Sequence, residues 1–310
     1  ARRALSQQLV WTLRQLAEVS AIELSAGGLP LIVPGAVNPQ PRDAWPDVDP
    51  GALPIGSTGF IVRPQSVSRL IGSAEEPVPG AAGDAGRTFT RIAVSLDSTR
   101  LAGVDGKGRL WTTRLEVGST LDPVPLEGPV ANPVFDHNGE LWAIDPVDGL
   151  IHLADDGAVN QVPISGLPVD ASVRMAVPSR DGTRVALIVT RGARNSLLVA
   201  RIVRPTPSGD VDISAPIRVE SSLDDVLDVS WSGADTLAVL GSEQPGSIEA
   251  FEVDLGRGAV TALGAPRAPI SIAAAPGLSP LIAGADGEVY EGTGGARQAR
   301  VRGTAPTYPN

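Results

Sequence analysis

Short apolar runs separated by turn residues fill the middle of this sequence. Between Ile92 and Arg114 the chain reads IAVSLDSTRLAGVDGKGRLWTTR, in which three apolar runs are divided by a polar segment at 95–100 and a turn at 105–108. Strand-like runs with turn residues at short intervals predict a β-meander. One meander of this size cannot bury both of its faces, so the fold depends on whether the unit is repeated.

The unit is repeated. Its first apolar residue after the first turn aligns at positions 40, 44, 52 and 44 residues apart, namely Leu101, Leu141, Val185, Leu237 and Leu281. Each copy continues with a second turn and a third run, and some copies have a weaker fourth run. A unit of short strands repeated every 40–50 residues or so is typical of β-propeller blades. The alternative is five loosely similar meanders in a sandwich or barrel.

A further blade precedes these copies but lacks its innermost strand. Residues 59–62 lie one repeat before Leu101 and predict a second strand, and residues 66–71 predict a third. The last residues, 305–309, resemble the innermost strand predicted at 132–136. We therefore predict a mainly β fold, a six-bladed propeller in which the C-terminal strand completes the first blade. Such closure removes the free sheet edges.

Residues 1–33 do not share the repeat. Residues 1–20 predict a helix because apolar side chains recur at helical spacing, at Leu5, Leu9, Leu13 and Leu16. Residues 21–25 alternate like a strand, and Gly27 and Gly28 predict a hairpin turn. A helix and one hairpin are too small to hold a core. Either the rest of a domain lies outside this sequence, which makes the chain a fragment, or the helix packs on the propeller.

Proline dominates the next segment. Six prolines lie between residues 34 and 54, too many for a strand within a ladder, so residues 34–57 predict an extended linker. Within it, we expect Trp45 to pack against the side of the propeller rather than to bind a ligand. The chain is thus divided into 1–33, a linker at 34–57 and a propeller at 58–310.

Composition argues against several classes of function. The net charge of −10 argues against nucleic acid and anionic lipid as main partners. Cysteine is absent, which excludes disulfides, thiolate metal sites and cysteine nucleophiles. No apolar run approaches the ~18 residues of a membrane span, and no stretch has the pattern of a signal peptide.

Catalytic and metal-binding patterns are also missing. The two histidines do not resemble catalytic bases, because His137 lies in a turn and His152 alternates with apolar residues in a strand. Acidic clusters occur at 145–149 and at Asp224, Asp225 and Asp228, but they lack the ligand spacing of a calcium loop. Solvated turns are the expectation and calcium is the alternative. We therefore predict no catalytic residue, no metal and no cofactor.

One loop carries positive charge on this acidic chain. Arg191 and Arg194 lie in the predicted loop 190–195, between the second and third strands of one blade. Such loops share a face of a propeller with the connections between blades. An acidic patch on a partner could bind these arginines, and solvated loop charges are the alternative reading.

Three features together indicate a family. Residues 8–13 (QLVWTL), with 22–24 (IEL) and the glycine turn, resemble the end of a GerMN domain. The motif Ser-x-Asp-x-Thr-Arg-Leu/Val-Ala at 95–102 and 179–186 is similar to TolB-type propellers. This order, with the tail Pro-Thr-Tyr-Pro at 306–309, resembles the LpqB lipoproteins of actinobacteria over essentially the whole chain.

The resemblance implies an extracytoplasmic protein anchored to the cell membrane by an N-terminal lipidated cysteine. The lipobox, its cysteine and most of the GerMN domain are not part of this sequence. The resemblance further implies association with the sensor histidine kinase MtrB of the MtrA–MtrB two-component system, and a role in signalling for the envelope and cell division. The family has no catalytic motif to transfer.

We therefore expect a non-enzymatic accessory module that binds a protein partner. Two alternatives stay open. The first is a hydrolase or lyase that uses a pair of carboxylates facing each other across the central channel. The second is a sensor of a small molecule or peptidoglycan fragment in the envelope.

Overall fold

The computed structural model describes residues 2–14, 16, 18–42, 44–45, 48, 57–72, 74–84, 86–155, 158–204, 210–219, 221–244, 246–292 and 298–310. For residues 152–155, 158 and 298–300 the backbone alone is described, so the expectation for the His152 side chain lies outside the described residues. The chain divides into two units, Ala1–Ala52 and Leu53–Asn310.

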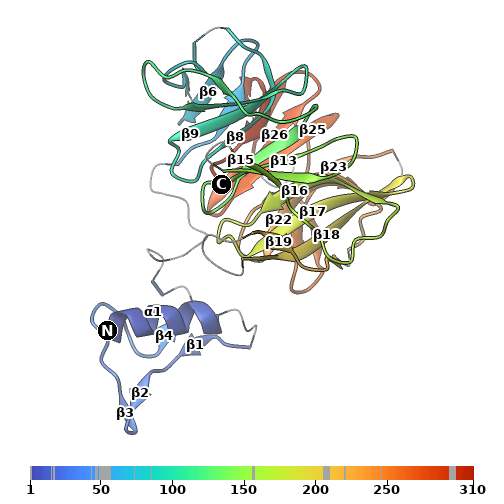
Figure 1. Cartoon of the computed structure of the whole chain (residues 1–310). Helices are drawn as coiled ribbons and strands as arrows, with labels where there is room; N and C mark the ends of the chain where they lie inside the picture. The colour runs from blue at the N-terminus through green and yellow to red at the C-terminus, as the bar shows by residue number, and fades with distance from the viewer. Residues whose placement is uncertain are drawn as a thin grey trace. The chain divides into compact units, whose positions relative to one another are not determined.

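The N-terminal unit contains a helix and two small sheets (Figure 1). Its elements are α1 (Arg2–Leu13), β1 (Ala21–Ile22) paired with β4 (Gln40–Pro41), and β2 (Ser25–Ala26) paired with β3 (Leu29–Pro30). Gly27 and Gly28 both have positive φ, so the predicted hairpin turn is confirmed. The helix is shorter than predicted, and its buried side chains are Ser6 and Val10 rather than the leucines.

Trp45 explains how this helix is oriented. Its indole Nε1 donates to Gln40 Oε1 at 2.8 Å and to Ser6 Oγ at 3.0 Å. The ring belongs to the core of the N-terminal unit, with Val10 and Ile22. The expectation that Trp45 packs on the propeller was therefore wrong. A buried indole N–H requires an acceptor, and residues of the N-terminal unit supply two.

Six antiparallel sheets of four or five strands form the larger unit, as far as its described residues show. Five of these sheets are contiguous in the chain. The first two are β8 (Phe89–Val94), β9 (Arg100–Asp105), β10 (Leu110–Arg114) and β11 (Asp122–Pro123), then β12 (Ala131–Phe135), β13 (Leu141–Ile144), β14 (Ile151–Asp155) and β15 (Ala158–Gln161). The third is β16 (Ala171–Pro178), β17 (Arg184–Arg191), β18 (Arg194–Val203), β19 (Asp212–Ile213) and β20 (Ile217–Arg218). The fourth and fifth are β21 (Asp225–Trp231), β22 (Thr236–Ser242), β23 (Glu249–Asp254) and β24 (Val260–Ala262), then β25 (Pro269–Ala275), β26 (Leu278–Gly284), β27 (Glu288–Glu291) and β28 (Gln298–Arg302).

The sixth sheet is built from both ends of this unit. It contains β29 (Thr304–Thr307), β5 (Phe60–Val62), β6 (Val67–Ile71) and β7 (Ala74–Pro77), in that order. The innermost strands β8, β12, β16, β21, β25 and β29 contact one another in sequence, and β29 contacts β8. The ring is thus closed, and Figure 1 marks the C-terminus among these strands. The predicted propeller, and its closure by the C-terminal strand, are confirmed.

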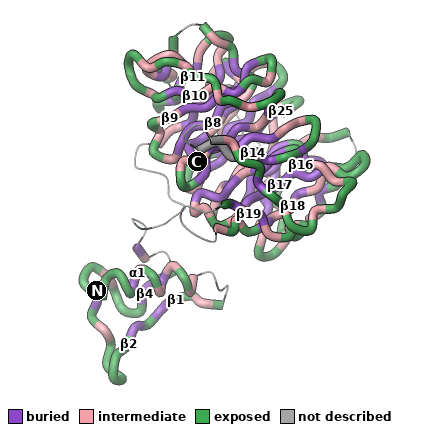
Figure 2. The backbone as a smooth tube through the Cα atoms, in the orientation of Figure 1, coloured by how far each residue is buried: buried purple, intermediate pink, exposed green. Residues whose placement is uncertain are grey.

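The core lies between neighbouring sheets. The aligned apolar residue of each repeat falls in the second strand of its sheet and is at most 1% exposed in every case: Leu101, Leu141, Val185, Leu237 and Leu281. Burial of one such side chain stabilises the fold by about 1.5–3 kcal/mol. Figure 2 shows that the buried residues of this unit gather in the strands and that many exposed residues lie in the connections.

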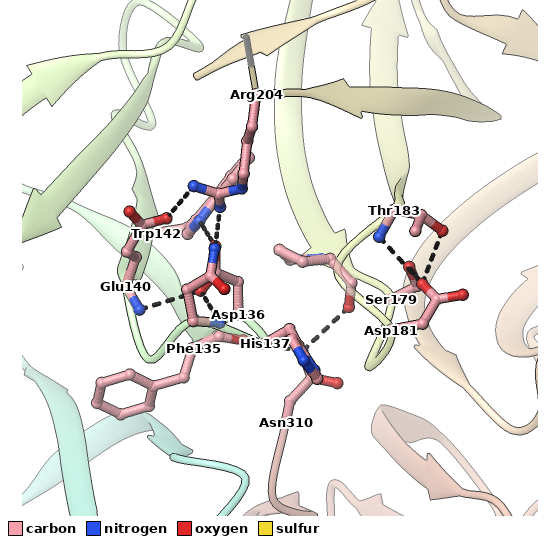
Figure 3. Close-up of polar contacts among 12 residues, drawn as sticks. Phe135, Asp136, His137, Glu140, Trp142, Ser179, Asp181, Thr183, Arg204 and Asn310 are labelled. Atoms are coloured by element: carbon pink, nitrogen blue, oxygen red, sulfur yellow. Dashed lines mark hydrogen bonds and ion pairs between the residues drawn. The ribbon is translucent and has the colours of Figure 1, made fainter. Parts of the chain in front are cut away.

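A repeated turn links each of two sheets to the next one. In the turn after β16, Ser179 Oγ accepts the N–H of Arg184 at 3.0 Å. Asp181 Oδ1 accepts the N–H of Thr183 at 3.0 Å (Figure 3). The Arg184 side chain then reaches the neighbouring sheet, where Nη1 donates to Asp235 Oδ1 at 2.9 Å and the guanidinium lies 5.1 Å from the ring centre of Trp231.

The turn after β8 repeats this arrangement. Ser95 Oγ accepts the N–H of Arg100 at 3.0 Å. Arg100 Nη1 donates to Gly139 O at 2.9 Å, and its guanidinium lies 5.0 Å from the ring centre of Phe135. The arginine of the motif that indicated a blade in the sequence therefore also joins that blade to its neighbour.

Candidate functional site: the central channel

Each innermost strand carries a shift in register against its neighbour. The shifts lie at Phe89/Arg91, Ala131/Val134, Val173/Met175, Val226/Asp228, Pro269/Ser271 and Thr304/Thr307. A β-bulge re-aims the side chains beside it. Arg91, Met175 and Asp228 each come directly after a shift, and all three line a cavity of about 80 Å³ at the centre of the ring. The bulges thus bring chemically different side chains to one channel.

An ion pair spans this channel. Arg91 Nη1 lies 3.2 Å from Asp228 Oδ2, with side chains 30% and 3% exposed. The two residues come from β8 and β21, which are three strands apart in the ring of six. Asp228 also accepts backbone N–H groups from Val229 at 2.9 Å and Ile272 at 3.1 Å. The prediction that Asp228 belongs to a solvated turn was wrong, because the residue lies inside a buried strand.

Arg180 is the second arginine of the channel and is only 5% exposed. Its guanidinium donates to the carbonyls of Pro309 at 3.0 Å, Trp231 at 2.9 Å and Ala274 at 3.0 Å. Burial lowers the pKa of Arg180 to about 10, which leaves the side chain protonated at neutral pH. No side-chain carboxylate pairs with it among the described residues.

Asn310 forms hydrogen bonds with the three innermost strands that the Arg180 guanidinium does not contact, β8, β12 and β16. Its Nδ2 donates to Phe135 O at 2.8 Å and Pro178 O at 3.0 Å, and its backbone N–H donates to Val94 O at 3.0 Å (Figure 3). Together, Arg180 and Asn310 bind carbonyls at or near the ends of all six innermost strands. Groups of the protein itself therefore occupy this end of the channel.

An acidic pair, the buried Asp136 and the half-buried Glu140, lies beside Asn310 (Figure 3). Arg204 forms ion pairs with Asp136 and with Glu140, the second at 2.6 Å. Asp136 Oδ2 also accepts the indole N–H of Trp142 at 3.1 Å. Burial and the neighbouring Asp136 raise the pKa of Glu140. Because Arg204 reaches both carboxylates, the arrangement acts as a structural salt bridge between two sheets.

His137 belongs to the same turn as this pair. Its Nδ1 lies 2.7 Å from the carbonyl oxygen of Arg180, and the residue is exposed. The structure therefore places His137 as predicted, as an exposed histidine held by the backbone, and it is hydrogen-bonded to no nucleophile among the described residues.

Arg191 and Arg194 lie at the end of a tight hairpin. They face each other across β17 and β18, and Gly192 and Ala193 alone form the turn. The predicted loop 190–195 is thus shorter than expected, because both strands continue to the arginines. Arg191 Nε donates to Asp170 Oδ2 at 2.8 Å, and both residues are exposed. Arg194 is exposed and forms no ion pair with any described residue.

In the parts of the chain that the structure describes, no three His, Cys, Asp or Glu side chains are grouped so as to hold a metal ion. Within the same residues, no helix combines the length and the hydropathy needed to cross a bilayer.

Sequence reasoning missed the role of the four residues that shape the channel. Arg91 and Asp228 are charged residues within mostly apolar stretches of their innermost strands, RIAV and LDVSW, and this is the signal that could have identified them. Arg180 and Asn310 gave no such signal, since their partners lie on strands far apart in the sequence.

A family model described as the lipoprotein LpqB beta-propeller domain matches residues 65–309. The chain belongs to this family. Lipoprotein LpqB of Thermobifida fusca is 29% identical over 97% of this chain, and Lipoprotein LpqB of Streptomyces coelicolor is 31% identical over 77%. The chain spans 56% and 42% of these two proteins.

A solved structure supports the fold of the LpqB family member. The crystal structure of TolB from Acinetobacter baumannii aligns with a TM-score of 0.62, covering 82% of this chain and 67% of that one. Its sequence is 15% identical, so the likeness concerns the fold alone.

Proposed function

We propose that this chain is the non-enzymatic binding module of an extracytoplasmic lipoprotein. The parent protein is held at the cell membrane by a lipid anchor that is not part of these residues. The module binds the extracytoplasmic domain of an MtrB-like sensor histidine kinase and modulates two-component signalling for the envelope and cell division. Residues 1–33 are the C-terminal part of a GerMN-like domain. Membership in the LpqB family and the names of the relatives support this proposal.

The set of charged groups that line the channel is the observation that carries the proposal. An enzyme using two carboxylates needs a pair of them facing a substrate. Among the described residues that line the cavity, Asp228 is the one carboxylate, and Arg91 and two backbone N–H groups already bind it. Arg180 and Asn310 fill the other end. A rigid ring with such a channel is suited to binding through its exposed loops.

The hairpin of Arg191 and Arg194 is the proposed contact with the kinase. Both side chains are exposed. Arg191 is paired with Asp170, and Arg194 forms no ion pair with any described residue, so Arg194 gives the hairpin a local positive charge on a protein of net charge −10. An acidic patch on the partner complements such a site and speeds association in a salt-dependent manner.

Direct binding to the purified kinase domain tests this function. We expect wild-type chain to bind, and the double variant Arg191→Glu, Arg194→Glu to bind about tenfold more weakly, mainly through slower association. Arg114→Glu is the matched control, since Arg114 is exposed at the far end of a third strand in another sheet, and it should bind like wild type. Absence of binding by both the chain and the full parent protein would overturn the function, and unchanged binding by the double variant would overturn the assignment of the hairpin.

A further inference from the structure

The cavity in the channel has room for a small ligand. A cavity needs roughly 10–15 Å³ to hold one water molecule, and this one measures about 80 Å³. It reaches from Arg91, whose side chain is 30% exposed, to the buried Arg180. A ligand could therefore enter past Arg91 and stop at Arg180.

The charges around this cavity favour an anion. Of the described residues that line it, Arg91 and Arg180 are positive and Asp228 is negative. The side chains that line the cavity thus carry one excess positive charge, although the protein as a whole is acidic. Inside a protein such a charge interacts more strongly with a counter-ion than it would in water.

Hydrogen-bond donors also remain available in the channel. A guanidinium has five N–H groups. Arg180 uses three of them on backbone carbonyls, and Arg91 uses one on Asp228. Buried donors without acceptors are rare in folded proteins.

We propose that this channel binds a small carboxylate, with Arg91 and Arg180 as the residues that hold it. A planar carboxylate matches the paired N–H groups of a guanidinium. Arg91 turns from Asp228 to the ligand, while Asp228 keeps its two backbone donors and so stays satisfied. The ligand is either a free short-chain acid or the carboxylate end of a longer molecule whose tail extends past Arg91. The site does not depend on the kinase proposed above.

Titration of the purified chain with acetate and acetamide at constant ionic strength tests this site. Two-dimensional ¹⁵N NMR of the arginine Nε–H signals is the measurement. We expect acetate to shift the signals of Arg91 and Arg180 saturably, and the isosteric but neutral acetamide to leave them unchanged. N-acetyl-alanyl-alanine and its C-terminal amide form a second pair of probes, which distinguishes the two kinds of ligand. Saturable binding of the acid would identify the carboxylate end of a longer molecule as the ligand. Failure of the acid to bind, while acetate binds, would identify a free short-chain acid.

Substitutions of Arg91 and Asp228 should change the affinity for acetate in opposite directions. Arg91→Gln should weaken acetate binding about tenfold, whereas Arg114→Gln, on the same sheet, should not change it. Asp228→Asn removes the anion that competes for Arg91, so it should strengthen acetate binding several-fold. Equal responses to acetate and acetamide in the wild-type chain would overturn the proposal, a result that requires no variant to fold. Weaker acetate binding by folded Asp228→Asn would also overturn it.

Discussion

At the scale of single residues, two aspartates use the same local device to hold a tryptophan. The sequences DGKGRLW at 105–111 and DHNGELW at 136–142 share their spacing. In each, one carboxylate oxygen accepts turn N–H groups and the other accepts the indole N–H six residues later, at 3.1 Å for both Asp105 and Asp136. One device lies in a turn between second and third strands and the other between first and second strands. The local sequence therefore determines this aspartate–tryptophan arrangement, whichever turn of the blade contains it.

Asp105 gives a prediction about pH. Burial alone would raise its pKa, but hydrogen bonds from Lys107, Arg109 and Trp111 outweigh burial and lower it to about 2. The unfolded value is about 3.9, so the folded state prefers the ionised form. Its stabilisation is complete above about pH 4 and is lost as the pH falls toward 2.

We expect Asp105→Asn to lower the free energy of unfolding at pH 7 by roughly 1–2 kcal/mol, after allowance for solvent screening. The difference from wild type should shrink below about pH 4 and be nearly gone at about pH 2. Urea unfolding across this range, followed by tryptophan fluorescence, measures both. A difference that stays constant from neutral to acid pH would contradict the role given to the carboxylate.

At the scale of elements, the positions of the strands were predictable from the sequence, but the side-chain contacts that join elements to one another were not. Alternation and turn glycines are local properties, so the second and third strands fall where the pattern placed them, for example β5 and β6. The prediction of the buried face of α1 failed because that face is not decided locally. Trp45 and Gln40, far along the chain, determine which face of the helix is buried. Likewise, the motif at 179–184 indicated a turn, but Arg184 acts on the neighbouring sheet.

Arg100 and Arg184 should each contribute about 1–2 kcal/mol to stability, from a charged hydrogen bond and a contact with an aromatic ring. We expect Arg100→Ala and Arg184→Ala to lower the free energy of unfolding by that amount. Because they join different pairs of sheets, their effects should add to within about 0.5 kcal/mol. Chemical denaturation measures each, with Arg114→Ala as the exposed control. Losses no larger than that of the control would show that the motif does not fasten the sheets.

At the scale of the whole molecule, the closed ring could be inferred from the sequence, but the chemistry of its channel could not. The tail at 305–309 looks like an innermost strand, and β29 does pair with β5. In contrast, Arg91 meets Asp228 137 positions away, and Arg180 meets carbonyls of three other segments. Only closure of the ring brings these groups together. The same closure leaves the exposed hairpins as the surfaces available to a protein partner.

Amide hydrogen exchange of this chain, alone and with the sensor-kinase domain bound, tests the central claim most directly. For the chain alone, the account predicts that β29 exchanges as slowly as β5, because the two strands form one sheet. On binding, it predicts new protection at the hairpin of Arg191 and Arg194 and none near Arg114. Exchange of β29 as fast as that of exposed loops would contradict the closed ring, and the absence of new protection anywhere would contradict the binding function.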